Sequence, residues 1–354
     1  MSNSFEKRMT SQVKVGSVLI GGNAPISVQS MTNVDTRDTP LVLDQIRRLK
    51  EAGCEIVRLA IPDIEAAKAI AAIKKSEKQI PIVADIHFDY RLALECLNNG
   101  IDKIRINPGN IGDMDRVKQV VTASKERGIP IRIGVNAGSL EKELLAKFGG
   151  PSSQAMVESA LGHVKILEDL NFVDTVISLK ASDVSMTIEA YRLLASKCSY
   201  PLHVGVTEAG TVKSGTIKSA IGIGTLLAEG IGDTIRVSLT SAPELEVTTG
   251  ISILKALGLR KGGVEIISCP TCGRCQIDLI EIAEQVEVAL ANCKKEIKIA
   301  IMGCGVNGPG EAKEADIGIA GGAGTAILFR KGEIIRKVPQ SDLVFELLKE
   351  IENF

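Results

Sequence analysis

Short apolar runs alternate with longer amphipathic stretches along most of the chain. Eight of the runs have the length and apolar content of β-strands: residues 26–31, 56–60, 82–87, 103–108, 131–136, 175–182, 202–209 and 234–239. The stretches between them have helical character; one spans residues 40–53, with Thr39 as the expected N-cap and Pro40 as the first helical residue. A β-hairpin is expected before them, over residues 13–22, with Gly16 in its turn. Eight β/α units in about 250 residues predict a (β/α)8 TIM barrel.

The pattern changes after residue 258. Residues 244–258 are expected to form the closing helix of the barrel, and the sequence L-R-K-G-G over 259–263 is typical of a linker. Beyond it, the pattern predicts strands over 264–267 and 297–303, a helix over 277–293, a hairpin over 325–338 and a final helix. We therefore expect two domains, a TIM barrel over residues 1–260 and a small α+β domain over residues 261–354.

Basic residues interrupt the apolar strands. Arg58, Arg105, Arg132 and Arg236 each lie between two apolar residues of a predicted strand. Because side chains alternate across a strand, flanking residues that pack outward on the helices leave each arginine facing the barrel axis. The same alternation places further polar residues on that inner face: Asp85, His87, Asn107, Asn136, Ser178, Lys180, Ser182, His203, Thr207 and Ser238.

Such a group of cations near the carboxyl ends of barrel strands favours a binding site for a phosphate or diphosphate. The alternative is that acidic residues inside the barrel, Asp85 and Glu208, neutralise the arginines.

Two loops of the C-terminal domain carry candidate metal ligands. Residues 268–275, S-C-P-T-C-G-R-C, contain Cys269, Cys272 and Cys275, and residues 303–311, G-C-G-V-N-G-P-G-E, add Cys304 and Glu311. Thiolates are soft ligands that select zinc, copper(I) or iron–sulfur clusters. A structural zinc site usually has a second pair of cysteines or histidines, which the second loop lacks. The pattern therefore favours an iron–sulfur cluster with three thiolates and one weaker or open position. A zinc knuckle or a set of buried free thiols remains the alternative.

Composition narrows the classes of function. The 354 residues carry a formal net charge of -1, which gives no electrostatic reason to expect a nucleic acid or an anionic membrane as partner. No apolar run is long enough to span a bilayer, and the N-terminus has no apolar signal region, so a cytoplasmic protein is expected. Eight cysteines without an export signal indicate a reducing compartment. Four of them, Cys54, Cys96, Cys198 and Cys293, lie in apolar segments and are expected to be ordinary thiols.

The C-P-T-C-G-R and G-C-x-V-N-G-P-G-E motifs, behind a barrel with these arginines, closely resemble the family of bacterial 4-hydroxy-3-methylbut-2-enyl diphosphate synthases. The resemblance covers the whole chain. It implies that the small domain is an iron–sulfur domain with a [4Fe-4S] cluster held by Cys269, Cys272, Cys304 and Glu311. Cys275 departs from the family pattern and is not assigned as a ligand.

The same resemblance implies a substrate and a set of contacts. The expected reaction is the reductive ring opening and dehydration of 2-C-methyl-D-erythritol 2,4-cyclodiphosphate to the linear diphosphate, in the non-mevalonate isoprenoid pathway. Glu208 is the expected proton donor, and Glu311 is expected to yield its iron to a substrate oxygen. The implied contacts of the substrate are Arg58, Arg105, Asn107, Arg132, Asn136, Lys180, Thr207, Arg236 and Ser238.

The resemblance also implies partners: reduced flavodoxin or ferredoxin as the electron donor, and a homodimer in which the cluster domain of one subunit caps the barrel of the other. Two other interpretations compete with it. The segment over residues 26–39 and the polar strand ends are also typical of pterin-binding barrels of the dihydropteroate synthase type, which leaves the C-terminal cysteines without a role. A non-enzymatic iron–sulfur redox sensor leaves the barrel arginines unexplained.

Overall fold

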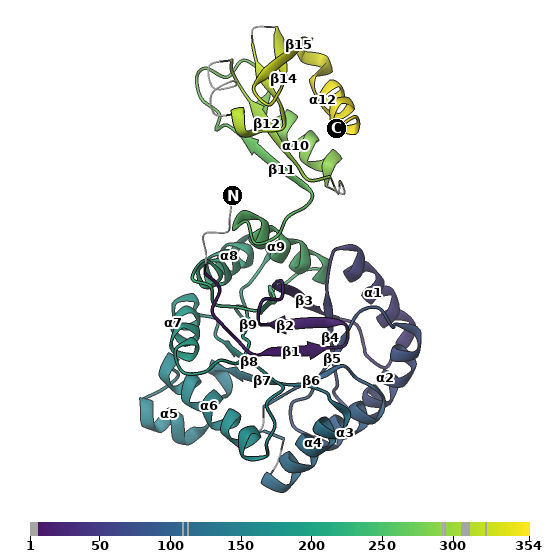
Figure 1. Cartoon of the computed structure of the whole chain (residues 1–354), viewed down its shortest axis with the longest axis vertical. Coiled ribbons are helices and arrows are strands. Elements are labelled where there is room, and N and C mark those ends of the chain that lie inside the picture. The colour runs from purple at the N-terminus through teal and green to yellow at the C-terminus, as the bar shows by residue number, and fades with distance from the viewer. Residues whose placement is uncertain are drawn as a thin grey trace. The chain divides into compact units, whose positions relative to one another are not determined.

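The chain divides into two compact units, Met1–Arg260 and Lys261–Phe354 (Figure 1). The computed structural model describes residues 6–107, 110–111, 113–291, 293, 295–305, 312–322 and 324–354. Within these ranges, no helix has the length and apolar character needed to cross a bilayer.

Eight parallel strands form the barrel of the first unit within the described residues, in the order β8-β7-β6-β5-β4-β3-β10-β9. A parallel bridge between Ile177 and Leu202 joins β8 to β9 and closes the circle, so the predicted TIM barrel is confirmed. The strands are β3 (Ser27–Met31), β4 (Ile56–Ala60), β5 (Ile82–Asp85), β6 (Lys103–Ile106), β7 (Ile131–Asn136), β8 (Thr175–Lys180), β9 (His203–Val204) and β10 (Thr234–Ile235).

Two strands are much shorter than predicted. Regular pairing of β9 and β10 covers only two residues each, where the sequence predicted residues 202–209 and 234–239. Beyond these pairs the chain keeps single hydrogen bonds to its neighbours, from Arg236 N to Val204 O at 3.0 Å and from Thr207 N to Ala181 O at 3.2 Å. The ladder therefore loosens at the carboxyl ends of these two strands, where polar residues face the barrel mouth.

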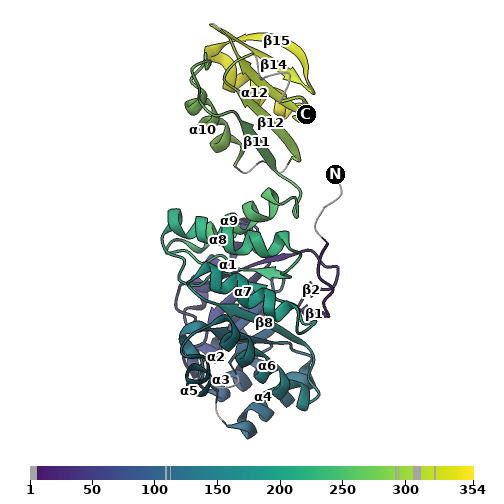
Figure 2. The same cartoon turned by 90° about the vertical axis from the view of Figure 1, so that its left-hand side faces the viewer.

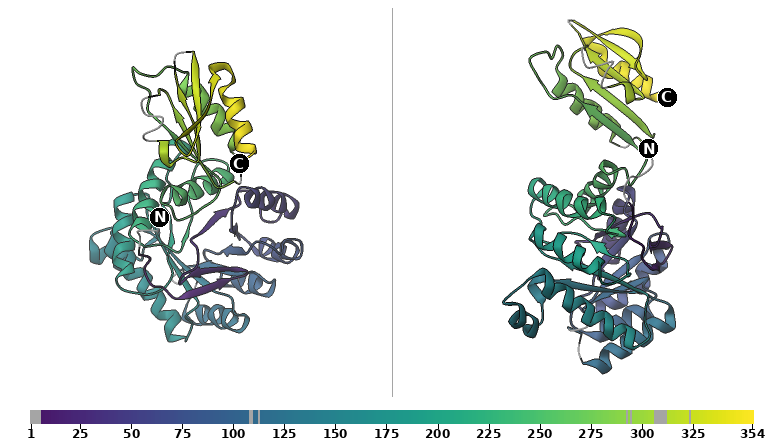
Figure 3. Two further views of the ribbon diagram at one scale, coloured as in Figure 1. Left: turned by 45° about the horizontal axis from the view of Figure 1, so that its top comes forward. Right: turned by 60° about the vertical axis from the view of Figure 1, so that its left-hand side comes forward.

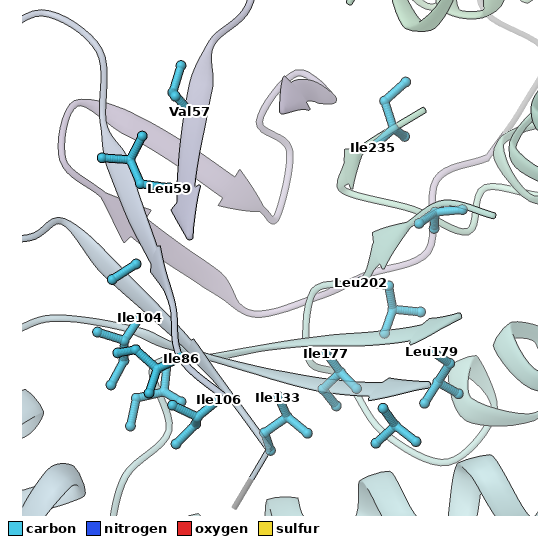
Figure 4. Packing of buried hydrophobic residues seen from close by; sticks show 14 of the residues in the cluster. Val57, Leu59, Ile86, Ile104, Ile106, Ile133, Ile177, Leu179, Leu202 and Ile235 are labelled. Carbon is cyan, nitrogen blue, oxygen red and sulfur yellow. The ribbon is translucent and has the colours of Figure 1, made fainter. Parts of the chain in front are cut away.

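The barrel helices form the outer ring seen in Figure 1. They are α1 (Thr39–Glu51), α2 (Ile64–Ser76), α3 (Tyr90–Asn98), α4 (Met114–Arg127), α6 (Ser153–Asp169), α7 (Val184–Ala195), α8 (Val212–Ala228) and α9 (Pro243–Ala256), with a short α5 (Lys142–Phe148) before α6. Apolar strand residues such as Val57, Leu59, Ile133 and Ile177 belong to one large aliphatic core (Figure 4).

The expected start of α1 was wrong by one residue. Asp38, not Thr39, is the N-cap, and its carboxylate accepts a hydrogen bond from Leu41 N at 3.1 Å. Thr39 and Pro40 are therefore the first two helical residues. A carboxylate stabilises the free N–H groups and the positive end of the helix dipole, so Asp38 suits the capping position.

A hairpin seals the amino-terminal end of the barrel. β1 (Gln12–Val15) and β2 (Val18–Gly21) pair antiparallel, with Gly16 at φ +55° in the turn, which confirms the predicted hairpin. It lies across the barrel opening in Figure 1 and at one end of the strands in Figure 2. One apolar cluster joins its side chains to strand residues at that end: Val13, Val15, Ile20, Ile56, Val83 and Val176. The floor of the barrel is therefore apolar and closed.

The second unit is a mixed sheet with helices packed on it (Figure 3). Its described elements are β11 (Val264–Ser268), α10 (Leu279–Leu290), β12 (Ile297–Met302), β13 (Ile317–Gly321), β14 (Thr325–Arg330), β15 (Glu333–Pro339) and α12 (Leu343–Glu352). The strands lie in chain order, with β11, β12 and β13 parallel and the last two antiparallel. Because β11 and β12 are parallel neighbours, the two cysteine loops leave the same edge of the sheet.

Strand β13 was not predicted. Its sequence, I-G-I-A-G, precedes further glycines and has the composition of a loop, but every one of its residues is buried. Gly318 is required because a Cβ there would lie 2.4 Å from the Phe329 ring, so β13 packs closely against β14.

Candidate functional site

Three of the predicted inward arginines are buried in the barrel around one carboxylate. Arg58, Arg105 and Arg132 are each at most 9% exposed. Nη1 of Arg105 donates a hydrogen bond to Oδ1 of Asp85 at 3.1 Å, and Nε of Arg58 lies 3.7 Å from Oδ2 of the same residue. Burial alone would raise the pKa of Asp85, but Arg58, a hydrogen bond from His87 and Arg105 outweigh it and hold that pKa far below its usual range. Asp85 therefore stays ionised and links two of the arginines.

The fourth arginine is held by a residue that the sequence did not suggest. Nη2 of Arg236 lies 3.1 Å from Oε1 of Glu246 on α9, and its Nη1 donates to Oγ of Ser238 at 2.5 Å. Glu246 is 4% exposed and also accepts a hydrogen bond from Ser30 at 3.0 Å. Strand alternation does not report on Glu246, but the sequence carries a signal for it, an acidic residue on the apolar face of the closing helix.

A second layer of polar side chains lies deeper in the barrel. Lys103 and His203 are 0% exposed and Arg132 is 1% exposed. Within the described part of the chain, Lys103 Nζ, Arg132 Nε and Nη1, and both ring nitrogens of His203 have no hydrogen-bond partner. Burial lowers the pKa of Lys103 well below its usual value, and Arg132 and Arg58 lower it further. Lys103 was not singled out from the sequence, although it is two residues before Arg105, whereas Arg132 and His203 were both expected on the inner face of the barrel.

Lys180 lies at the end of β8 and is 7% exposed. Burial lowers the pKa of Lys180 well below its usual value, and the charges of Arg236 and Arg58 lower it further. Gly205 makes room for it, because a Cβ at that position would lie 2.9 Å from Nζ of Lys180. The amine of Lys180 can therefore lie this close to the backbone only because residue 205 is a glycine.

Cations outnumber acids in this interior. The described buried basic residues of the barrel are Arg58, Lys103, Arg105, Arg132 and Lys180, to which Arg236 adds a side chain that is 18% exposed. The acids that face them are Asp85 and Glu246, since the buried Asp233 is bound by Lys7 at 3.3 Å. The expectation that acids inside the barrel neutralise the arginines therefore holds only in part. Excess positive charge in a buried site favours an anionic ligand.

The residues expected to contact substrate come from adjacent parts of the barrel. Asn107 and Ser238 are buried, and Asn136 and Thr207 are half-buried. Asn107 follows β6 and Asn136 ends β7, the strands of Arg105 and Arg132, while Thr207 and Ser238 follow β9 and β10. Glu208 is exposed and has a left-handed backbone at φ +51°, a conformation that strains a residue with a side chain. It therefore does not neutralise the buried arginines, but it lies in the loop that follows β9, at the carboxyl end of the barrel.

The second candidate site lies in the C-terminal unit. A pocket of about 100 Å³ is lined by Cys269, Pro270, Cys272, Arg274, Cys275, Gly303 and Cys304. The backbone ties the two loops together, because Gln276 N donates to Gly303 O at 2.8 Å and Gly303 N donates to Cys269 Sγ at 3.2 Å. Hydrogen bonding from the backbone N–H of Arg274, followed by the charge of its guanidinium, lowers the pKa of Cys272.

The three expected thiol ligands thus border one pocket, with N–H groups placed to stabilise thiolates. This donor set fits a soft, thiolate-bound group such as an iron–sulfur cluster. Among the residues that the structure describes, no three His, Cys, Asp or Glu side chains already surround one point as metal ligands, so the thiols must turn to bind. Glu311, the fourth expected ligand, lies outside the described residues.

Comparison with known proteins agrees with both halves of the chain. Residues 10–251 match the model of the GcpE TIM-barrel domain, and residues 265–353 match that of the GcpE protein C-terminal domain. The 4-hydroxy-3-methylbut-2-en-1-yl diphosphate synthase (flavodoxin) of Ruminiclostridium cellulolyticum is 64% identical over 353 residues, covering 100% of both chains. The enzyme of the same description from Geobacter sulfurreducens is 62% identical over 347 residues, covering 98% of each.

Among solved structures, a truncated 3-deoxy-D-arabino-heptulosonate 7-phosphate synthase from Thermotoga maritima is similar in fold. Its TM-score is 0.51 at 12% sequence identity, covering 71% of this chain and 94% of that one. At this identity the likeness supports the barrel fold alone.

Proposed function

The chain belongs to the GcpE family of flavodoxin-dependent 4-hydroxy-3-methylbut-2-en-1-yl diphosphate synthases, and we propose that its barrel binds the cyclic diphosphate while its C-terminal cysteines hold the cluster that reduces it. It is an oxidoreductase of the non-mevalonate isoprenoid pathway. The match covers the whole chain, so the pterin-barrel and redox-sensor interpretations were wrong.

The excess of buried basic residues over acids in the barrel is the observation that supports the substrate assignment. We assign the diphosphate of 2-C-methyl-D-erythritol 2,4-cyclodiphosphate to Arg58, Arg105, Arg132, Lys180 and Arg236. These basic side chains outnumber the nearby acidic ones. Arginine forks bind phosphate oxygens in pairs and fix the orientation of the ligand. The remaining substrate contacts are assigned to Asn107, Asn136, Thr207 and Ser238, which border the same mouth.

These side chains act by positioning. Arg105 and Arg58 are held by Asp85, and Arg236 is held by Glu246 and Ser238, so their guanidinium groups are in place before substrate arrives. Preorganised cations in a site with little water stabilise the additional negative charge that the diphosphate acquires when the ring opens.

The proposed cofactor is a [4Fe-4S] cluster on Cys269, Cys272, Cys304 and Glu311. When bound, it supplies the electrons for the reduction and a Lewis-acidic iron for the departing oxygen. The shared thiol pocket and the bond from Gly303 N to Cys269 Sγ support three of these ligands. A carboxylate is a harder and more labile ligand for iron than a thiolate, so Glu311 is suited to give way to substrate.

Glu208 is the proposed proton donor. The substrate hydroxyl leaves as water, which requires a proton, and Glu208 is an exposed acid with a strained backbone in the loop that follows β9. Strain of this kind is found where a side chain is held in place for function.

A second copy of the chain is proposed to supply the cluster domain that covers each barrel mouth. The last residue of the barrel unit, Arg260, donates from Nη2 to Ile26 O at 2.9 Å and to Glu55 Oε2 at 2.8 Å. Both acceptors precede their strands and lie at the sealed floor, opposite the mouth. The chain therefore leaves the barrel at the end opposite the mouth, which supports a homodimer with sites shared between subunits.

The proposal also includes reduced flavodoxin as electron donor, the donor in the relatives' description, with ferredoxin as the alternative. A reducing, cytoplasmic location is proposed as well, which the eight unpaired cysteines support.

The test is iron and acid-labile sulfide analysis with reduced-state EPR, on protein purified without oxygen, before and after addition of the cyclic diphosphate. About four irons and four sulfides per chain are expected, with an EPR signal that substrate changes. The matched variant Arg132→Met should keep the cluster signal but lose most of its response to substrate. Tightly bound zinc without sulfide would contradict the cofactor, and an unchanged response in Arg132→Met would contradict the assignment of the barrel cations.

A further inference from the structure

The thiol pocket is bordered by one cysteine more than the proposed ligand set uses. Cys275 lines the same pocket as Cys269, Cys272 and Cys304. The four cysteines follow the pattern C-x-x-C-x-x-C with a distant fourth cysteine. Ferredoxins hold [4Fe-4S] clusters with four thiolates, three of which come from a C-x-x-C-x-x-C run. The extra thiol therefore completes an all-cysteine ligand set within one chain.

Three of these cysteines, Cys269, Cys275 and Cys304, lie next to Gly303. A Cβ atom on Gly303 would lie 2.6 Å from Sγ of Cys275, so that only glycine leaves room for this thiol. The N–H of Gly303 donates to Sγ of Cys269 at 3.2 Å, and Cys304 is the next residue in the chain. The remaining thiol, Cys272, is joined to Cys275 by a backbone hydrogen bond from Cys275 N to Cys272 O at 3.0 Å.

We propose that Cys275 is an alternative fourth ligand of the cluster, which exchanges with Glu311 as long as no substrate occupies that iron. The proposal rests on the cluster assignment made above. It gives the site two ligand sets, one with Glu311 that can open to substrate and one with four thiolates that is closed.

The exchange is a ligand substitution without electron transfer. In the structure the Cys275 thiol donates to Ile277 O at 3.2 Å. To bind iron, Cys275 releases this hydrogen bond, gives its proton to the displaced carboxylate or to water, and turns its sulfur toward the pocket that it already borders. One iron–oxygen bond breaks and one iron–sulfur bond forms. A set of four thiolates leaves no position for a substrate oxygen, so this form protects the site from loss of its fourth iron.

The experiment compares Glu311→Ala with the double variant Glu311→Ala/Cys275→Ser, both purified without oxygen. Iron and sulfide content and the EPR spectrum of the oxidised protein are measured, so the result does not depend on turnover. We expect about four irons per chain in Glu311→Ala, and about three in the double variant, with the EPR signal of a three-iron cluster. Adding Cys198→Ser, a thiol of the barrel unit, to Glu311→Ala is the matched control and should leave four irons.

A second measurement keeps Glu311 in place. The rate of iron release to a chelator is compared between the wild-type chain and Cys275→Ser, without oxygen and without substrate. Several-fold faster release from Cys275→Ser is expected. Loss of the fourth iron in Glu311→Ala to the same extent as in the double variant, with equal release rates, would overturn the proposal. A wild-type chain without iron and sulfide would instead refute the cluster assignment itself, so the two failures are distinguishable.

Discussion

Arg105 lies against the backbone of Gly134, and a Cβ atom on that glycine would be only 2.3 Å from Nε of the arginine. Nη2 of Arg105 donates to the carbonyl oxygen of Gly134 at 3.2 Å, while Nη1 reaches Asp85 at 3.1 Å. Gly134 occupies an inward position of β7, two residues after Arg132. The absence of a side chain at Gly134 on β7 therefore leaves the space that the guanidinium of Arg105 on β6 occupies.

Gly134→Ala is expected to displace Arg105 from Asp85, because the methyl group would overlap its guanidinium. The variant should be less stable by about 1–3 kcal/mol and should bind the cyclic diphosphate more weakly. Thermal unfolding and substrate titration measure the two effects. Gly138→Ala is the matched control, since a Cβ there meets nothing within 4 Å. Equal stability and affinity of the two variants would contradict this role of Gly134.

Asp85→Asn removes the carboxylate that links two buried arginines. Unpaired buried charges are costly, so a loss of about 3–5 kcal/mol in the free energy of unfolding is expected without ligand. Inorganic diphosphate should recover part of this loss in the variant, because it supplies the missing negative charge. Chemical denaturation with and without diphosphate measures both. The exposed pair of Asp44 and Arg47 at 2.7 Å provides the control, and Asp44→Asn should change stability far less than Asp85→Asn.

The low pKa of Asp85 also fixes the direction of its pH dependence. A carboxyl whose folded pKa is depressed stabilises the fold above its unfolded pKa, and the contribution is lost as pH falls through the folded pKa. The stability difference between wild type and Asp85→Asn should therefore be constant at neutral pH and shrink only in strong acid. A difference that disappears near pH 6 would show that Asp85 is not the ionised partner of the arginines.

Lys103→Met is expected to stabilise the protein at neutral pH, by about 1–3 kcal/mol, since it removes a buried donor without a partner. Burial lowers the pKa of Lys103, so the unfolded chain binds a proton that the folded chain binds less readily. This contribution rises with pH up to the unfolded pKa of about 10.4, and the gain from Lys103→Met should shrink over the same range. Unfolding curves at several pH values measure the difference. A variant less stable than wild type at every pH would mean that the amine is paired.

Complementation tests the shared site. Arg132→Met inactivates the barrel and Cys304→Ser removes a proposed ligand, so each variant alone should be inactive. Co-expressed with different tags and purified as a mixed dimer, they should recover up to about half of the wild-type activity, because one of the two composite sites is intact. Mixed dimers with no activity would show that the barrel and cysteines of one chain work together. A mixed dimer that carries both changes on the same chain is the control for correct pairing.

Strand alternation was sufficient to predict that the strand arginines are buried inside the barrel. Arg58 on β4, Arg105 on β6 and Arg132 on β7 are buried as this alternation predicts, and two of them contact Asp85. Glu246 was not predictable in this way, because the residue that a helix presents to the barrel depends on how that helix crosses the strands. Strand β13 was missed because its glycines, which resemble those of a loop, are required by close packing against Phe329. The cysteine spacing predicted one thiol pocket, but not the backbone contact from Gly303 that joins its two loops.

The apolar cluster of Val13, Val15 and Ile20 covers the amino-terminal end of the barrel, which leaves the carboxyl end as the route to its buried cations. Under the proposed assignment, substrate and product use the same end of the barrel, so the product has to leave before the next substrate enters. The linear diphosphate product is therefore expected to be a competitive inhibitor. A closed floor also keeps counterions from reaching Arg132 from below, which directs the field of this guanidinium toward the carboxyl end of the barrel and the solution from which the anionic substrate arrives.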